Sequence, residues 1–195
     1  MNALAVSEME SPIGTLLIVT AEEQLCAIEF GGLEHVREPL AHWSRRWFGL
    51  DRFVRDDKAT APVRKQLEQY FAGERRQFHL PLLLRGTPFQ IRVWQALLEI
   101  PYGETRSYRE VARMIGAEKA VRAVGGANNR NPLPIVVPCH RVIGADGSLV
   151  GYGGGLSIKR HLLQWEARHA QEQAGVGTDR RNAEMLPATG KGGTA

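Results

Sequence analysis

A cysteine and a histidine are adjacent in the stretch PCHR at 138–141, between an extended apolar run and a turn. A thiolate is a strong nucleophile, and a neighbouring imidazole is a base that can take up its proton. The pair therefore makes Cys139 a candidate nucleophile, although a small buried side chain is the other interpretation of a lone cysteine. Cys26 lies in an apolar strand pattern, which indicates an inert buried thiol.

The composition is that of an ordinary globular protein. The chain has 195 residues, of which 43% are hydrophobic and 24% charged, and these values exclude collagen-like, wholly disordered and coiled-coil classes. No apolar run approaches the roughly 20 residues of a membrane helix, and the first residues carry no basic segment of a secretion signal. Two cysteines are too few for a disulfide framework. We therefore expect a cytoplasmic protein with no membrane partner.

Positive charge is concentrated in one part of the chain. Residues 88–168 contain 11 Lys and Arg against 6 Asp and Glu, whereas the rest contains 14 against 15. A local excess of this kind is typical of a module that binds a polyanion, and a merely basic surface is the alternative.

Patterns in the first half predict a small α/β domain over residues 1–86. Two apolar runs between Gly14 and Phe30 flank a polar turn and indicate a β-hairpin, with a further strand at Phe78–Leu84. Two helices are predicted, at Leu33–Phe48 and Pro62–Ala72. His35 and His42 are interpreted as surface or packing residues.

The second half, residues 87–168, is predicted to be mainly helical. Thr87 caps a first helix, and Ser107-x-x-Glu110 has the form of a capping box that opens a short helix ending at Gly116. A basic helix over Glu118–Asn129 follows almost at once. Two short helices joined by a tight turn are typical of a helix-turn-helix, although any helical hairpin can produce this pattern.

The end of the chain is predicted to contain one more helix and a tail. Ser157 is the predicted cap of a helix from Ile158 to about Ala167. Beyond it, residues 169–195 lack periodicity and are rich in Gly and polar residues, so we expect a disordered tail.

Several motifs in residues 87–168 occur together in a known order. PCHRV at 138–142 is preceded by RNPLPIV and followed by GYGGG and a helix with Trp165-Glu166, while TPFQIRVWQALLEIPYGETRSY and VRAVGGA lie upstream. In order and spacing these resemble the O6-alkylguanine-DNA alkyltransferase family. The resemblance implies an α+β fold in which a small N-terminal α/β domain precedes a mainly helical domain with a winged-helix-like helix-turn-helix.

The activity that the resemblance implies is direct reversal of DNA damage. A methylated-DNA–[protein]-cysteine S-methyltransferase moves the alkyl group of O6-alkylguanine, and we expect also of O4-alkylthymine, irreversibly to its own cysteine. Here that acceptor is Cys139, and no cofactor is needed. His140 matches the base that acts through a water molecule, and Glu166 matches the carboxylate that orients it. Such a dyad can favour thiolate.

Other residues match positions that shape the family's active site. Asn131 corresponds to the asparagine that braces the active-site turn, and Tyr108 to the tyrosine that rotates the nucleotide and donates a hydrogen bond to the base. The backbone carbonyls of Cys139 and Val142 and the backbone amide of Gly153 match groups that read the edge of the base. Tyr152 is also expected at this base pocket.

The implied partner is double-stranded DNA. A base within a duplex has to be flipped out before a sulfur can reach it, and the family enters the minor groove, which carries little sequence information. Arg122 matches the arginine that fills the resulting gap. The remaining DNA-binding residues implied by the resemblance are Lys119, Ala123, Gly126 and Arg130. We expect a monomer, and cooperative binding along DNA stays open.

The sequence departs from the family at two points. Eukaryotic members bind zinc through N-terminal Cys and His residues, and the lone Cys26 cannot reproduce such a site, so we expect no metal. Gly153 replaces a larger side chain found in several relatives, which predicts a more open pocket that admits bulkier alkyl groups.

Two alternatives come from different functional classes. A DNA-binding sensor of alkylated bases would recognise the lesion without transfer, but relatives of that kind replace the cysteine. A Cys–His hydrolase would use the same dyad for acyl transfer, but it explains neither the basic helix pair nor Arg122.

Overall fold

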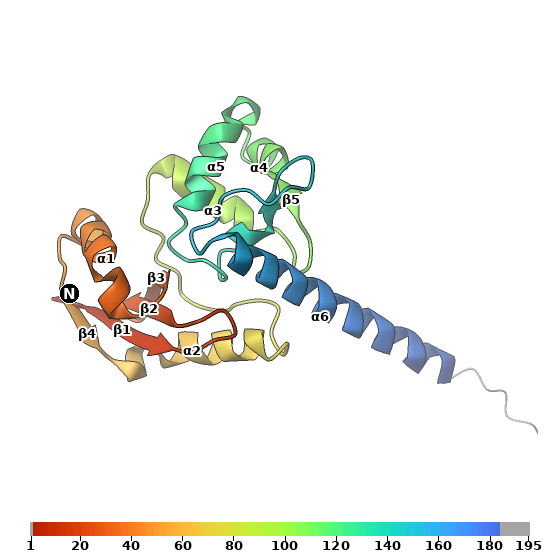
Figure 1. The fold of residues 1–195 in the computed structure, drawn as a ribbon, viewed down its shortest axis with the longest axis horizontal. Coiled ribbons are helices and arrows are strands. Elements are labelled where there is room, and N and C mark those ends of the chain that lie inside the picture. Colours follow the sequence, from red (N-terminus) through yellow and green to blue (C-terminus); the bar gives the residue numbers. More distant parts are fainter. Residues whose placement is uncertain (1, 184–195) are drawn as a thin grey trace, which may run out of the picture.

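The computed structural model describes residues 2–183, which form a sheet-containing N-terminal half and a helical C-terminal half (Figure 1). Four strands build the sheet: β1 (Leu4–Met9), β2 (Leu16–Ala21), β3 (Gln24–Phe30) and β4 (Phe53–Arg55). The spatial order is β3-β2-β1-β4, antiparallel except for the parallel β1–β4 pair. The predicted hairpin is therefore confirmed as β2–β3, with Leu16 opposite Phe30.

Two helices cover opposite faces of this sheet. Helix α1 (Leu33–Phe48) has the predicted bounds and packs over a core cluster that includes Leu4 and Leu17. Helix α2 spans Asp57–Phe71 and therefore begins five residues before the predicted start at Pro62. The Asp56 side chain accepts hydrogen bonds from the backbone N–H groups of residues 58 and 59, and this cap sets the true beginning of the helix.

The predicted strand Phe78–Leu84 is wrong. In its place the chain forms a single parallel bridge between Leu82 and Leu25 beside the edge strand β3. Leu25 donates to the carbonyl of Pro81 and accepts from Leu83. Because Pro81 has no N–H to donate, a continuous ladder cannot form across this segment.

The C-terminal half contains the predicted helices in order. They are α3 (Pro88–Leu98), α4 (Tyr108–Met114), the 3₁₀ turn η1 (Glu118–Ala120) and α5 (Val121–Asn129). Both α3 and α4 begin with complete capping boxes, Thr87 with Gln90 and Ser107 with Glu110. The pair α4–α5 is the predicted helix-turn-helix.

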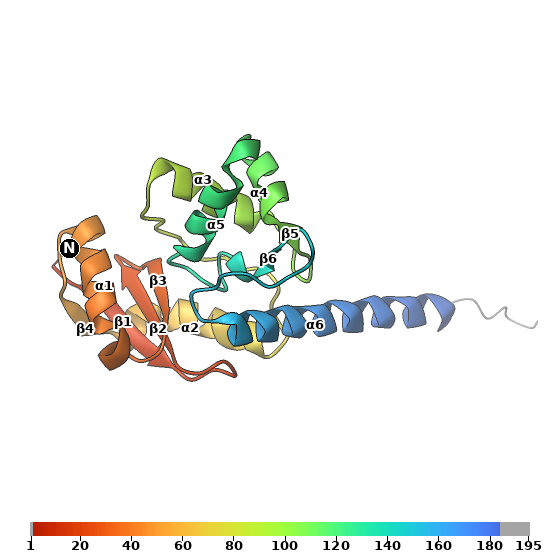
Figure 2. The same ribbon diagram turned by 45° about the horizontal axis from the view of Figure 1, so that its top comes forward.

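Short elements and one long helix complete the chain. A two-residue parallel pair joins β5 (Arg106–Ser107) to β6 (Val142–Ile143), next to the 3₁₀ turn η2 (Cys139–Arg141). Helix α6 spans Leu156–Ala183 and extends away from the body (Figure 2).

Helix α6 corrects two expectations at once. It begins one residue before the predicted cap Ser157, and it continues through residues 169–183, where we expected disorder. Residues 170–174 (AQEQA), directly after the predicted end, are good helix formers and let the helix continue without apolar periodicity. The rest of the predicted tail, 184–195, lies outside the described residues.

The main core runs through both halves of the molecule. Ile18 of the sheet, Leu67 of α2, Trp94 of α3 and Val137 before η2 belong to one buried cluster. The segment that holds Cys139 is thus packed between the sheet and the helices rather than on a flexible surface loop. This burial fixes the position of the candidate active site.

Candidate active site and DNA interface

The segment between α5 and Cys139 is an irregular turn held by the side chain of Asn131. Its Oδ1 accepts from the Leu133 N–H at 3.0 Å, and its Nδ2 donates to the Val137 carbonyl at 2.7 Å. Between these points Ile135 has φ of 75°, a left-handed conformation that is costly for a β-branched residue. Asn131 therefore lies where its side chain can brace the turn.

Cys139 begins η2 and is almost completely buried, with 4% of its surface exposed. The Asn128 amide donates to its carbonyl at 3.3 Å. Burial raises the pKa of the thiol to about 11, and the nearby Asn131 amide and Lys159 ammonium only partly oppose this. At rest the sulfur is a thiol, so the low thiol pKa that we expected from a His–Glu dyad is not found in this conformation.

His140 and Glu166 are in direct contact, which the sequence could not decide. His140 Nε2 lies 2.8 Å from Glu166 Oε1, and both side chains are buried. Burial lowers the pKa of His140 despite the attraction of the carboxylate, so the imidazole is neutral near pH 7. A neutral ring that donates from Nε2 has its lone pair on Nδ1, and this atom has no hydrogen-bond partner among the described residues.

Glu166 accepts hydrogen bonds from several groups besides His140. Arg141 donates from Nε and Nη2 at 2.8 and 3.0 Å, the Gly103 N–H at 3.1 Å and the Tyr70 hydroxyl at 2.8 Å. Burial alone would raise the pKa of this carboxyl, but His140 and Arg141 hold it well below its usual range. Glu166 is therefore a buried, fully partnered anion that fixes the histidine ring.

Tyr108 is the first residue of α4 and is half-buried between the two helices and the loop after β6. Its hydroxyl donates to the Val150 carbonyl at 2.9 Å, and a Cβ at Gly125 of α5 would lie 3.8 Å from its ring. Burial raises the pKa of Tyr108, so it is a neutral phenol that can donate a proton to a hydrogen bond.

Lys159 is a buried residue that the sequence analysis missed. Its ammonium donates to the carbonyls of Val142 and Val150, at 2.5 and 2.9 Å, and lies 5.8 Å from the centre of the Tyr108 ring. Burial lowers the pKa of Lys159 to about 8. It thus ties the loop 142–150 to α6. Arg141, Tyr70 and Asn128 were also missed; Arg141 lies inside the PCHRV motif, which could have drawn attention to it.

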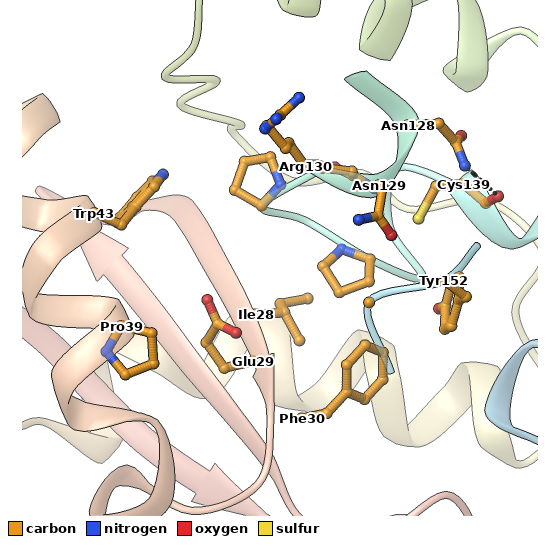
Figure 3. A pocket seen from close by; sticks show the side chains of 14 residues that line it. Ile28, Glu29, Phe30, Pro39, Trp43, Asn128, Asn129, Arg130, Cys139 and Tyr152 are labelled. Atoms are coloured by element: carbon orange, nitrogen blue, oxygen red, sulfur yellow. Dashed lines mark hydrogen bonds between the residues drawn. The ribbon is translucent and has the colours of Figure 1, made fainter. Parts of the chain in front are cut away.

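A cavity of about 260 Å³ lies beside the cysteine (Figure 3). Its walls come from the turn after α5 and the loop before α6 on one side, and from β3 and α1 on the other. The residues of the first side include Asn128, Asn131, Pro134, Cys139, Tyr152 and Gly153. Burial raises the pKa of Glu29, on the second side, to about 7. A Cβ built at Gly153 meets no other part of the protein within 4 Å, so the cavity is open at this point.

The predicted base-reading carbonyls have partners within the protein. That of Cys139 accepts from Asn128, and that of Val142 from Lys159. Each carbonyl oxygen retains a second lone pair that can accept from a bound base. Tyr152 is buried in the cavity wall, and the Gly153 N–H lies beside it in the same loop.

The residues predicted to bind DNA lie on the helix-turn-helix. Lys119, Arg122 and Ala123 are exposed at η1 and the start of α5, while the inward Val124 is fully buried. At the other end of α5, Arg130 is exposed and donates to the carbonyl of Gly126 at 3.3 Å. Arg122 is thus separated from Arg130 by the length of the helix, and both remain accessible.

Neither a metal centre nor a membrane segment is found within residues 2–183. No three His, Cys, Asp or Glu side chains of this part of the chain are grouped so that they could hold a metal ion. None of its helices is both long enough and apolar enough to cross a bilayer.

Two family models match nearly the whole of the folded chain. The 6-O-methylguanine DNA methyltransferase ribonuclease-like domain matches residues 6–84, and the DNA-binding domain of the same name matches residues 88–168. Among curated relatives, the methylated-DNA–protein-cysteine methyltransferase of Methanosarcina acetivorans is 49% identical over 158 residues, which are 80% of this chain and 94% of the relative. The Mycobacterium bovis protein of the same name is 50% identical over 83% of this chain and 92% of its own length.

Solved structures give the same result. The Mycobacterium tuberculosis OGT complex with DNA is similar with a TM-score of 0.73 and 45% identity, covering 85% of this chain and 94% of the other. The O6-methylguanine methyltransferase of that organism, solved separately, also has a TM-score of 0.73, at 47% identity over 87% and 94% of the two chains.

Proposed function

This chain belongs to the 6-O-methylguanine DNA methyltransferase family, and on that premise we propose how its buried cysteine repairs alkylated DNA. It is a methylated-DNA–protein-cysteine methyltransferase that acts in DNA repair, and its partner is DNA. In our proposal Cys139 accepts the alkyl group. The observation that carries this assignment is the surroundings of Cys139: it lines the cavity shown in Figure 3, and the next residue, His140, is hydrogen-bonded to the buried carboxylate of Glu166.

The transfer is a displacement at the alkyl carbon. A bond forms between Cys139 Sγ and that carbon while the bond from the carbon to guanine O6 breaks, and its electron pair stays on the base. The thiol proton is lost and the guanine gains one, so the products are an S-alkylcysteine and an unmodified guanine. A thioether is stable, and no group in the site can cleave it. One chain therefore repairs one lesion.

His140 takes the thiol proton. Because burial raises the pKa of Cys139 to about 11, the proton has to leave as the sulfur attacks. The Nε2 of His140 is bonded to Glu166, which leaves Nδ1 as the acceptor, and we infer that a bridging water carries the proton to it. Glu166 stabilises the imidazolium that forms.

Recognition uses the helix-turn-helix. Arg122, exposed at the start of α5, enters the minor groove of the duplex and fills the gap left by the flipped nucleotide. Tyr108 exchanges its bond to the Val150 carbonyl for one to the leaving guanine. All of these groups belong to the same chain, and we propose that the protein acts as a monomer. The open wall at Gly153 supports acceptance of O4-alkylthymine and of bulkier O6-alkyl groups.

The residue assignment is tested by comparing the two cysteines. Cys139→Ser should abolish removal of methyl groups from duplex DNA that contains O6-methylguanine, whereas Cys26→Ser should retain it, because Cys26 is buried in the sheet with a pKa raised to about 12. Lesion removal is followed by chromatography of the hydrolysed DNA. Full activity in Cys139→Ser would refute the assignment; lesion-selective binding by the unsubstituted protein without transfer would favour the sensor alternative.

A further inference from the structure

A second cavity, of about 530 Å³, lies between α1 and the start of α3 and has a basic and aromatic lining. Four of its residues carry or can carry positive charge, and three have an indole ring; the full lining is His42, Trp43, Arg46, Trp47, Arg85, Thr87, Gln90, Trp94 and Arg130. No carboxylate is among them. We call this cavity and its lining the basic groove.

The arginines of the basic groove are unpaired and partly fixed in place. Arg46, Arg85 and Arg130 are exposed, and none forms an ion pair with another residue in the described part of the chain. The Arg46 guanidinium lies 5.2 Å from the Trp47 ring centre, and that of Arg85 lies 5.4 Å from Phe48. Three unpaired guanidinium groups around one cavity repel one another, and a polyanion relieves this repulsion.

The basic groove adjoins the cavity of the active site. Trp43 and Arg130 line both, and Figure 3 shows them on opposite sides of the space between α1 and the turn after α5. A polymer with one unit in the Cys139 cavity could therefore continue into the basic groove. Trp43 and Trp47 are only half-buried, so part of each indole is accessible to such a ligand.

We propose that the basic groove binds single-stranded DNA, with phosphates on the arginines and an unpaired base against an indole. The aromatic lining decides between single and double strands, because the bases of a duplex are stacked on one another and present no free face to a side chain. This binding goes beyond the repair reaction: it gives the protein a second contact with DNA, for unpaired strands, besides the duplex contact proposed for Arg122.

Binding of a fluorescent oligothymidylate of about 12 nucleotides, a length within the usual site size, tests the proposal. Arg46→Gln/Arg85→Gln keeps a polar side chain at both positions but removes two charges. We expect the Kd of this double variant for the oligothymidylate to rise about tenfold. The slope of log Kd against log salt should fall by about 1.4, because each lost phosphate contact on a single strand lowers the slope by about 0.7. Trp47→Leu should weaken binding by a similar factor through lost stacking.

Arg45→Gln is the matched control for charge. Arg45 is next to Arg46 on α1 and is also exposed, but it pairs with Asp51 at 2.7 Å and does not line the groove. It should leave oligothymidylate binding within about twofold of the unsubstituted protein, since a surface ion pair contributes little. Polyglutamate, an anion without bases, should compete poorly. Equal Kd values for Arg46→Gln/Arg85→Gln and Arg45→Gln would overturn the proposal. So would competition by polyglutamate as strong as that by unlabelled oligothymidylate.

A parallel assay separates this proposal from the repair function. Alkylation of Cys139 by free O6-benzylguanine should be the same in Arg46→Gln/Arg85→Gln and in the unsubstituted protein, because neither arginine lines the Cys139 cavity. Weaker oligothymidylate binding by this variant, together with normal alkylation of Cys139, supports the proposal that the basic groove binds single-stranded DNA. Normal oligothymidylate binding by the groove variant refutes it, whether or not Cys139 is alkylated.

Discussion

Glu166 is the single residue on which the hydrogen bonds of the site converge. It connects His140 and Arg141 of η2 with Gly103 and with Tyr70 of the N-terminal half. An ionised carboxylate that is buried this deeply is tolerated because every donor around it points at its two oxygens. The orientation of the proposed base therefore depends on a charge that is itself held by three further residues, Tyr70, Gly103 and Arg141.

The charge of Glu166 predicts a specific dependence of stability on pH. Its pKa in the folded protein lies below the ordinary value of 4.5, so the ionised form contributes stability above about pH 4.5 that is lost as the pH falls through the folded pKa. Glu166→Gln removes this contribution and leaves buried Arg141 without its partner, which should cost about 3 kcal/mol at pH 7. Urea unfolding from pH 7 to pH 3 measures both effects. Parallel stability–pH curves for the two proteins would contradict this explanation.

The absence of a side chain at Gly153 should determine how large an alkyl group the protein accepts. Gly153→Arg should reduce the rate of transfer from O6-benzylguanine about tenfold more than that from O6-methylguanine, because the larger group needs the space that the arginine takes. Gly153→Ala is the control, since its Cβ meets no atom within 4 Å. Rates are measured under single-turnover conditions on DNA carrying each lesion. An unchanged ratio of the two rates in Gly153→Arg would show that this wall does not set the preference.

At the scale of elements, our proposal requires the helix-turn-helix to deliver Arg122 to the duplex. Arg122→Ala should slow transfer from duplex DNA by about tenfold, since the flipped base loses the side chain that fills its place. Reaction with free O6-benzylguanine, which needs no flipping, should change by less than about twofold. Arg113→Ala, an equal change of charge at an exposed position of α4, is the control. Equal losses on both substrates would remove Arg122 from the flipping step.

Local sequence signals correctly predicted where helices α3 and α4 begin. Thr87 and Ser107 cap α3 and α4 as expected, because a capping box involves residues only three apart. The predicted strand at 78–84 does not form, because Pro81 has no N–H to donate to a ladder. Helix α2 begins earlier than predicted, because its N-cap is Asp56. Strands β1 and β4 were missed, since their pairing depends on residues far away in the chain.

Contacts between distant residues also limited what the sequence could predict about the candidate active site. The PCHRV motif and its spacing to Glu166 predicted Cys139, His140 and Glu166 as the reacting residues, but the contact between His140 and Glu166 joins residues 26 apart. The bond from Tyr70 spans 96 residues and has no signature in the local sequence. Contacts of this kind are determined by the packing of the whole chain, so a single sequence gives no direct sign of them.

At the scale of the whole molecule, the N-terminal half supports the reaction centre. The Tyr70 hydroxyl of α2 donates to Glu166, and the Trp165 indole of α6 donates to the Tyr70 carbonyl at 3.2 Å. Both contacts lie in a core that is shared by the two halves. The N-terminal half thus helps to fix the carboxylate that is hydrogen-bonded to His140, the proposed base.

This coupling predicts an effect of a residue outside the reaction centre. Tyr70→Phe removes one hydrogen bond to a buried charge and should lower the free energy of unfolding by about 2 kcal/mol. Tyr152→Phe is the control: its hydroxyl is also buried but has no hydrogen-bond partner among the described residues, so its removal should cost less. Urea unfolding of both variants at pH 7 gives the comparison. A loss in Tyr152→Phe as large as that in Tyr70→Phe would argue against a specific bond across the halves.

Intact-protein mass spectrometry with peptide mapping tests the central claim most directly. The protein is incubated with an excess of duplex DNA containing O6-methylguanine until the reaction stops. We predict a single addition of about 14 Da per chain, located on Cys139, and one lesion repaired per chain however much DNA is added. A methyl group on any other residue, or repair of several lesions per chain with no adduct, would contradict the proposed transfer.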